Sequence, residues 1–413
     1  MKKSALSAFC LILISLTSII SAQSLLSLQF PLGNFKPSQS SRSLMFGGAG
    51  TADATDLNVM NGNPASLGAI EKTVFSSLFL SQITRIKEDA LATNHFAFIP
   101  SQLSFAFPLG AAGAIAFGFE KRSVFNEIFR SEAIAIDPYD PLSTQQIGLS
   151  RTGGINVWQA GWGISLPKNI KLGLSYERTY FTINNNIVQS SVVSGKEFFS
   201  RDSSSLSWQG NGVRAGIIIP LASFTVGLAG EYFFEGLANL SHAVYADSAG
   251  YLRKLSTTSG EGAINLQLPV SIQGGIGYTI SPEWYTVLDV QTTLYSSTFV
   301  SDSALSPATA ANSFSFSLGG QYIPAPNLLT PRYWETINYR AGAHFSQLPV
   351  STAMEFGGII GCGLPLIGGG MFDIALGIDR RFDTRFVNYS EDVFTLAVGV
   401  NAGRKWKKST QGY

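Results

Sequence analysis

The chain has 413 residues, a formal net charge of +1 and only 13% charged residues. Soluble domains usually carry about twice that charged fraction, whereas the 42 glycines and 12% aromatic residues favour turns and strands. The near-neutral charge, without a basic patch among aromatic residues, gives no reason to expect nucleic-acid binding.

Residues 1–22 are typical of a secretory signal peptide. Two lysines open the segment, an apolar core follows from Ala8 to Ile20, and cleavage is expected before Gln23. The alternative, a membrane anchor, is disfavoured because the core is too short to span a bilayer. Cleavage removes Cys10 and leaves Cys362 alone, so no intramolecular disulfide is expected.

Alternating apolar and polar residues predict β-strands through residues 72–413. Between Ile264 and Ile280 the even-numbered positions are mostly apolar, as on one face of a single long strand. Fourteen such runs lie near residues 73–84, 96–108, 113–124, 155–166, 169–181, 206–220, 223–235, 264–280, 284–295, 313–323, 337–346, 353–364, 371–382 and 393–404. An even number of strands, each about long enough to cross a bilayer at a tilt, is typical of bacterial membrane barrels.

The connections between these runs alternate in length. Short turns rich in proline and glycine are expected at one end of the barrel. Long polar loops are expected at the other end, over residues 125–154, 182–205, 236–263 and 296–312. In lipid an open sheet edge leaves backbone groups unpaired, so the sheet must close. The predicted fold is therefore all-β: a transmembrane antiparallel β-barrel of about 14 strands.

The same alternation assigns charged residues to the inward face, because a lipid-facing Arg or Lys costs roughly 2–4 kcal/mol at the bilayer midplane. Most of them are expected to hold the lumen together by hydrogen bonds. Arg214 and Arg340 are the candidates for meeting a ligand's carboxylate. The inward set is Glu120, Glu177, Arg214, Glu231, Asp289, Arg340, His344, Glu355, Asp373, Asp379 and Arg381. Tryptophans near strand ends are expected in the interfacial girdles: Trp158, Trp208, Trp284, Trp334 and Trp406.

Residues 23–71 differ from the rest of the chain. Residues 23–42 are serine-rich and are expected to be an extended lead-in. Residues 43–70 are rich in glycine and show neither the helical period nor strand alternation, which predicts a compact hatch inside the barrel lumen. The hatch motif consists of Gly47, Gly48, Gly50, Asn63, Pro64 and Ala65.

This glycine run, with Asp53 and Asp56 and the Asn63-Pro64-Ala65 triplet, resembles the N-terminal hatch of the FadL/OmpP1/TodX transporters. The resemblance implies a monomer in the outer membrane of a Gram-negative-type cell, in contact with lipid and lipopolysaccharide. It also implies passive uptake of hydrophobic compounds such as long-chain fatty acids or aromatic hydrocarbons, without a cofactor. A similar opening occurs in PorV/PorQ barrels, which implies the alternative function: a component that binds proteins of a type IX secretion system.

The expected ligand site is an apolar cleft among the outer loops, with Phe125, Ile128, Phe129, Ile134 and Ile136 as candidates. The alternation changes phase around Pro100, and proline cannot donate to a strand ladder, which predicts an interrupted strand. In FadL-like proteins a kinked wall strand opens a lateral gap. The alternative is that the strand simply begins after Pro100.

Enzymatic chemistry is not expected. The run Gly47 to Gly50 lacks the Gly-Lys-Ser/Thr end of a phosphate loop. The three histidines have no metal-ligand spacing, so no metal is expected. No Gly-x-Ser-x-Gly motif occurs. A hydrolase with His344 as its base stays a minor alternative.

Overall fold

The computed structural model describes residues 39–404, except residues 56, 58, 60–61, 89–90, 132, 138–139, 194–195, 249–250, 298–310, 350, 367–368 and 386–388. The predicted signal peptide, the lead-in up to residue 38, Asp56, most of the predicted loop 296–312 and Trp406 lie outside the described residues. No helix in the described part is long and apolar enough to cross a membrane.

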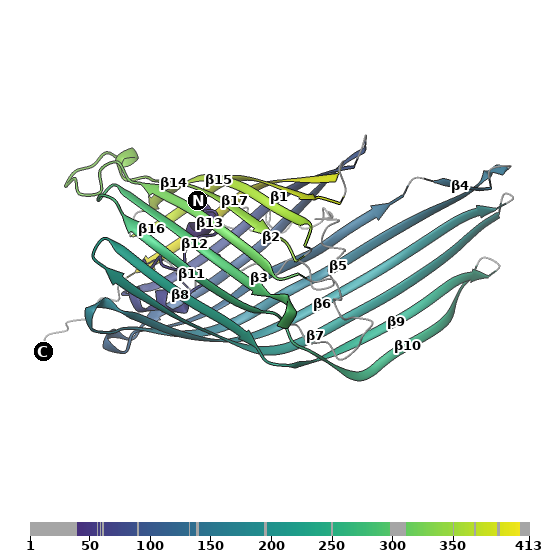
Figure 1. Cartoon of the computed structure of the whole chain (residues 1–413), viewed down its shortest axis with the longest axis horizontal. Helices are drawn as coiled ribbons and strands as arrows, with labels where there is room; N and C mark the ends of the chain where they lie inside the picture. The colour runs from purple at the N-terminus through teal and green to yellow at the C-terminus, as the bar shows by residue number, and fades with distance from the viewer. Residues whose placement is uncertain are drawn as a thin grey trace, which may run out of the picture.

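The described chain forms one antiparallel sheet of 17 strands that closes into a barrel (Figure 1). Closure follows from β1, which pairs with β2 on one side and with β17 on the other. The strands are β1 (Thr73–Glu88), β2 (Leu91–Pro108), β3 (Ala114–Arg130), β4 (Ile134–Asp137), β5 (Asp140–Ser165), β6 (Lys171–Val193), β7 (Lys196–Leu221), β8 (Phe224–Phe233), β9 (Gly236–Ser248), β10 (Tyr251–Leu266), β11 (Val270–Thr279), β12 (Trp284–Leu294), β13 (Ser313–Tyr322), β14 (Asn338–Gln347), β15 (Ala353–Leu366), β16 (Gly370–Asp383) and β17 (Tyr389–Arg404).

These strands make fourteen wall strands in the described part of the chain. β3 and β5 form a hairpin. β4 pairs with β5 alone and lengthens this hairpin on the β3 side, so it is not a separate wall strand. β8 and β9 are consecutive halves of one wall strand, because both pair with β7. β11 and β10 are likewise two halves, pairing with β8 and β9 respectively. The predicted fold class and strand number are therefore confirmed.

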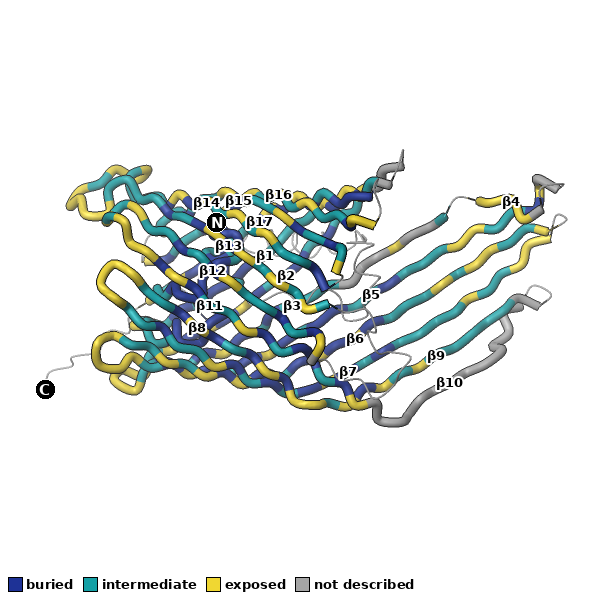
Figure 2. Tube along the Cα trace, viewed as in Figure 1, coloured by how far each residue is buried: buried dark blue, intermediate teal, exposed yellow. Residues whose placement is uncertain are grey.

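The outer surface of the wall carries many exposed large apolar side chains. Figure 2 shows exposed and buried residues alternating along the wall strands. On β16, Leu376 is 60% exposed while its neighbour Ala375, which faces inward, is 2% exposed. Every region of the wall contributes exposed large apolar side chains, among them Phe105, Phe117, Leu174, Leu228, Ile276, Leu318, Ile360, Leu376 and Leu396. A continuous apolar band of this size is unusual for a soluble monomer.

The inward parity of the predicted charged residues is confirmed at most positions, since the majority of that set is buried. Two details of the prediction are wrong. The predicted strand 264–280 is broken at residues 267–269, because Pro269 cannot donate to the ladder. The break changes the face, so that Leu266 is buried but Ile272 is 50% exposed. Trp208 is 2% exposed inside the barrel, and its indole Nε1 donates to the Leu266 carbonyl across 2.9 Å, so it is not a girdle residue.

Three of the four predicted outer loops are not loops, because most described residues of 125–154, 182–205 and 236–263 continue the strands β3, β5, β6, β7, β9 and β10. We call the described residues of these three segments, which include β4, the wing. In Figure 1 the wing projects far beyond the ends of β1, β2 and β14 to β17, on one side of the barrel mouth. Polar strands beyond a membrane wall keep their ladders as long as a neighbouring strand continues with them, which loop-length reasoning does not reveal.

Candidate functional site

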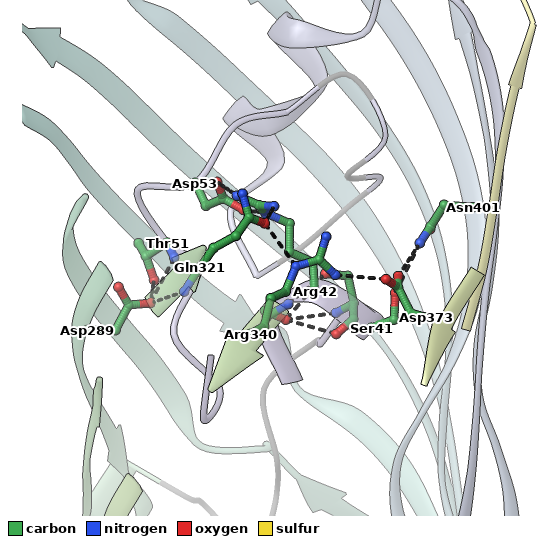
Figure 3. A network of polar contacts seen from close by, with 12 residues as sticks. Ser41, Arg42, Thr51, Asp53, Asp289, Gln321, Arg340, Asp373 and Asn401 are labelled. Carbon is green, nitrogen blue, oxygen red and sulfur yellow. Dashed lines mark hydrogen bonds and ion pairs between the residues drawn. The ribbon is translucent and has the colours of Figure 1, made fainter. Parts of the chain in front are cut away.

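The described residues of the N-terminal segment (residues 39–70) lie inside the barrel and contact the inner side of the wall on β5 to β8 and β11 to β17. Figure 3 shows the polar contacts of this segment with Asp289, Gln321 and Asp373. Ser41 Oγ donates to Asp373 of β16 at 2.5 Å. The backbone amides of Gly50 and Thr51, together with the Thr51 hydroxyl, donate to one oxygen of Asp289 on β12 at 2.7–2.8 Å. Arg42 bonds both Asp53 within the segment and Gln321 on β13.

The Asn-Pro-Ala triplet forms the start of a short 3₁₀ helix, η3 (Pro64–Ala69). The Asn63 side chain accepts from the Ala65 amide at 3.0 Å, and Pro64 takes the first helical position, where no amide donor is needed. Asn63 Nδ2 also donates to the carbonyls of Thr51 and Ile217, at 2.8 and 3.2 Å. The triplet therefore caps a helix and ties the segment to β7.

Glycines on the wall allow the segment to lie directly against the strand backbones. A Cβ on Gly342 of β14 would lie 2.2 Å from the Gly47 nitrogen, and one on Gly173 of β6 would lie 2.2 Å from the Pro64 carbonyl carbon. Such contacts recur at Gly163, Gly173, Gly216, Gly227, Gly319, Gly342, Gly361 and Gly399, each on a different strand. We call this set the glycine collar. At the turn within the segment, Gly47 and Gly48 have φ of 70° and 102°, a conformation that favours glycine.

A charged layer lies next to the collar along the barrel axis. On β6, Glu177 follows the collar residue Gly173 by four positions and so shares its inward face. Arg214 of β7 lies 2.9 Å from Glu177 and 2.6 Å from Glu231 of β8. The layer consists of Glu120, Arg122, Glu177, Arg214 and Glu231, all at most 6% exposed. Three carboxylates thus face two guanidinium groups.

An apolar layer follows the charged layer, at the base of the wing. On β6 the inward residues after Glu177 lead to Phe181 and Ile183, which are 1% and 2% exposed. On β7 the order from collar to mouth is Gly216, Arg214 and then Trp208. The apolar layer comprises Ile155, Val157, Phe181, Ile183, Leu206, Trp208, Phe233, Ala238, Leu266, Leu268 and Tyr295. The sequence analysis missed this layer, although the inward parity of β5 to β7 contains it.

The wall is incompletely paired between β2 and β3. Their ladder runs only from Gln102–Glu120 to Pro108–Ala114. Above that level β2 pairs with β1 and β3 pairs with β5. β2 itself continues through Pro100, with a bulge where Leu78 pairs with Gln102 but Phe79 with Pro100. Pro100 therefore lies inside a continuous strand, two residues beyond the last β2–β3 pair.

The predicted ligand residues are not brought together as a loop cleft. Phe125, Ile128 and Phe129 belong to β3, whereas Ile134 and Ile136 belong to β4. Ile128, Ile134 and Ile136 are exposed, by 42%, 64% and 47%. Arg214 is held in the charged layer, and Arg340 is paired with Asp373 at 2.7 Å and Gln321 at 2.9 Å. Both arginines face inward as expected, but carboxylate and amide groups of the barrel already engage them.

Carboxylates also outnumber cations elsewhere in the described lumen. Near the N-terminal segment, Asp53, Asp289 and Asp373 face Arg42 and Arg340. On β14 to β17, Arg381 contacts Glu355 and Glu391, and His344 lies 3.3 Å from Glu355 and 3.7 Å from Asp379. Among the described residues no three His, Cys, Asp or Glu side chains are placed to hold one metal ion.

A family model named BamG matches residues 1–410. The chain belongs to the BamG family. A search of curated proteins finds no match.

Solved structures show the same fold as this BamG-family chain at low sequence identity. A FadL homologue of Pseudomonas aeruginosa is 13% identical, with a TM-score of 0.61 over 90% of this chain and 99% of that chain. The toluene transporter TodX of Pseudomonas putida is 14% identical, with a TM-score of 0.57 over 90% and 100%. The monoaromatic hydrocarbon channel CymD is 15% identical, with a TM-score of 0.57 over 91% and 99%. The FadL-like barrel expected from the sequence is thus confirmed as a fold.

Proposed function

We propose that this barrel lies in the outer membrane and takes up uncharged apolar compounds passively. The observation that carries the proposal is the apolar layer around Phe181 and Trp208, which adjoins the charged layer and has more buried residues than the other apolar clusters described inside the barrel. Burying apolar ligand surface there would be favourable by about 25 cal/mol per Å². The printed names of the similar structures, a FadL homologue, a toluene transporter and a monoaromatic hydrocarbon channel, agree with this class of cargo.

The charges favour a neutral ligand over a fatty-acid anion. Directly below the apolar layer, three carboxylates face two guanidinium groups, and Arg214 is already within 2.9 Å of Glu177 and 2.6 Å of Glu231. On the side of the charged layer, a further carboxylate would enter a buried site with a formal charge of −1 and lose its hydration next to guanidinium groups that are already engaged. Toluene-like compounds do not meet this penalty. We therefore do not assign a ligand-binding role to Arg214 or Arg340.

The route in this proposal has two parts. The N-terminal segment serves as the hatch, and its contacts with β5 to β8 and β11 to β17 support this role. The missing ladder between β2 above Gln102 and β3 above Glu120 provides the outlet from the apolar layer to the membrane. Uptake is then driven by the concentration of the compound, so no cofactor is required.

The test compares retention of radiolabelled toluene and radiolabelled oleate by the purified barrel in mild detergent. We expect toluene to be retained and oleate to be retained more weakly. Phe181→Asp should lower toluene retention about tenfold, since removing apolar contacts from such a site costs roughly 1–3 kcal/mol. Tyr180→Asn is the matched control, because Tyr180 is its neighbour on the outer face and 42% exposed. Preferential retention of oleate, or no retention of either compound, would contradict the proposal.

A second candidate function, a component that binds partner proteins, is favoured by one observation. The strands β5, β6 and β7 have 26, 23 and 26 residues, far more than the 9–11 that cross a bilayer. The additional length forms the wing, which uptake of a small molecule does not require.

A further inference from the structure

The wall is interrupted a second time, on the side of the barrel where two neighbouring wall strands each consist of two halves. The ladder that joins β8 to β11 ends at the pair Glu231–Ser271. The ladder that joins β9 to β10 begins at the pair Gly236–Leu266. In the described part of the chain no register pair joins residues 232–235 to residues 267–270. We call these two stretches the β8–β11 break.

Side-chain hydrogen bonds bridge the break in place of a ladder. The Nε2 atom of Gln267 donates to the Phe233 carbonyl at 2.9 Å. The indole Nε1 of Trp208 donates to the Leu266 carbonyl, also at 2.9 Å. A side chain can rotate out of its hydrogen bond alone, whereas a ladder pair separates only if the two strand backbones move apart. The break is therefore a part of the wall that can open without unpairing a strand.

Two aromatic rings close the inner side of the break. A Cβ on Gly210 of β7 would lie 2.2 Å from the Cζ2 atom of Trp208, and one on Gly236 of β9 would lie 2.6 Å from its Nε1 atom. A Cβ on Gly212 of β7 would lie 2.6 Å from the Cδ1 atom of Phe233. The rings thus occupy positions where the wall has no side chain of its own. Trp208 and Phe233 are 2% and 0% exposed, so the break is closed in this structure.

The outer side of the break lies at the boundary of the membrane. Tyr232 and Phe234 are 44% and 46% exposed, and their rings meet edge to face with centroids 5.4 Å apart. On the barrel side of this pair the wall exposes Leu228 and Ile272, and on the other side the wing begins at Gly236 (Figure 1). Exposed aromatic residues gather where a barrel passes from lipid to water. Apolar compounds dissolve in the lipid, so they reach the break from the outer leaflet.

The apolar layer extends from this break to the gap between β2 and β3. At one end of the layer, Phe233 and Leu268 belong to the break itself. At the other end, Val157 of β5 pairs with Glu120, the last residue of β3 in the ladder with β2, and Ile155 pairs just beyond it. The layer therefore joins the two interruptions of the wall by a continuous set of apolar side chains.

We propose that the β8–β11 break is a gated entry through which uncharged apolar compounds pass from the outer leaflet into the apolar layer. Rotation of Trp208 and Gln267 opens the break, and the compound crosses the layer toward the gap between β2 and β3. This inference rests on the proposed uptake of apolar compounds and adds to it the side of entry and the residues that control its rate. Gln267 is a positioning residue, because it holds the break closed through the Phe233 carbonyl.

The experiment follows entry of a photoreactive toluene analogue, phenyl(trifluoromethyl)diazirine, into the full chain in phosphatidylcholine vesicles. The vesicles are mixed rapidly with the probe, a timed flash of light attaches it, and mass spectrometry measures the product at each residue. We expect Leu268 to be labelled before Ile155. Gln267→Leu keeps a side chain of similar size but removes the donor, so it should raise the initial rate of Leu268 labelling about fivefold. The final extent of labelling should stay within twofold, because the apolar contacts remain.

Gln291→Leu is the matched control. Gln291 Nε2 also makes a side-chain hydrogen bond, to the Ser271 hydroxyl at 3.0 Å, but it lies within the continuous ladder between β11 and β12. The control should leave the rate unchanged, and both variants should retain toluene in detergent as the unmodified chain does, which shows that barrel and layer are intact. Equal initial rates in the two variants, or labelling of Ile155 before Leu268, would overturn the inference while leaving the uptake proposal standing. Absence of toluene retention by the unmodified chain would overturn both.

Discussion

The glycine collar makes a quantitative prediction about the N-terminal segment. In Gly342→Ala, the new Cβ would lie 2.2 Å from the Gly47 nitrogen and from the Phe46 carbonyl carbon. Since carbon atoms in contact prefer separations of about 3.5–4.0 Å, the segment must move away from β14 by more than about 1 Å. The clash is with backbone atoms, which cannot rotate away. Overpacking of this kind typically costs about 1–3 kcal/mol.

That cost destabilises the state in which the segment is bound to the wall. It therefore raises the equilibrium constant for release of the segment from the wall by about 5- to 150-fold. Hydrogen exchange of residues 43–50, followed by mass spectrometry in detergent micelles, measures this change. Gly358→Ala is the matched control: this glycine lies on the neighbouring strand β15, and the nearest atom to its added Cβ is 3.8 Å away. The control should exchange as the unmodified chain does, and both variants should stay folded as barrels. If Gly342→Ala and Gly358→Ala show equal protection over residues 43–50, the segment is not held by close contact with the collar.

Three further predictions concern single side chains. Asp289→Ala removes the acceptor shared by the Gly50 and Thr51 amides and should destabilise the bound segment by about 2–6 kcal/mol. Asp289→Asn keeps an acceptor and should cost about 1 kcal/mol. The rate of hydrogen exchange at the Thr51 amide distinguishes the two variants. Leu376→Arg, in the middle of β16, should lower barrel stability in vesicles by about 2–4 kcal/mol in urea titrations, whereas Leu329→Arg in an exposed turn should change little. At the outer end of β16, burial alone would raise the pKa of Asp383, but hydrogen bonds from Arg385 outweigh it and lower that pKa to about 2. Its stabilising contribution is therefore present above the unfolded pKa of about 3.9 and is lost as the pH falls toward 2. In Arg385→Met, the unfolding temperature should therefore fall less steeply between about pH 3.9 and pH 2 than in the unmodified chain.

The sequence by itself determined the barrel, because two-residue alternation assigns each side chain to one face of a strand. From that alternation follow the fourteen wall strands and the inward position of residues such as Glu177, Arg214 and Asp373. Turn residues marked the short connections, for example around Pro167 to Asn169, because proline and glycine act locally. The Asn63-Pro64-Ala65 motif was visible for the same reason: a cap and a first-turn proline need only adjacent residues.

Only the tertiary structure decided features that depend on which strand has a neighbour. Residues 182–205 look like a polar loop, yet they stay in a sheet because β5, β6 and β7 extend together and satisfy each other's backbone. The end of the β2–β3 ladder at Gln102, the collar glycines opposite the N-terminal segment, and the engagement of Arg214 and Arg340 by carboxylates are also contacts between distant residues. Local patterns carry no information on such pairings, since the free energy that selects them arises only when the barrel closes.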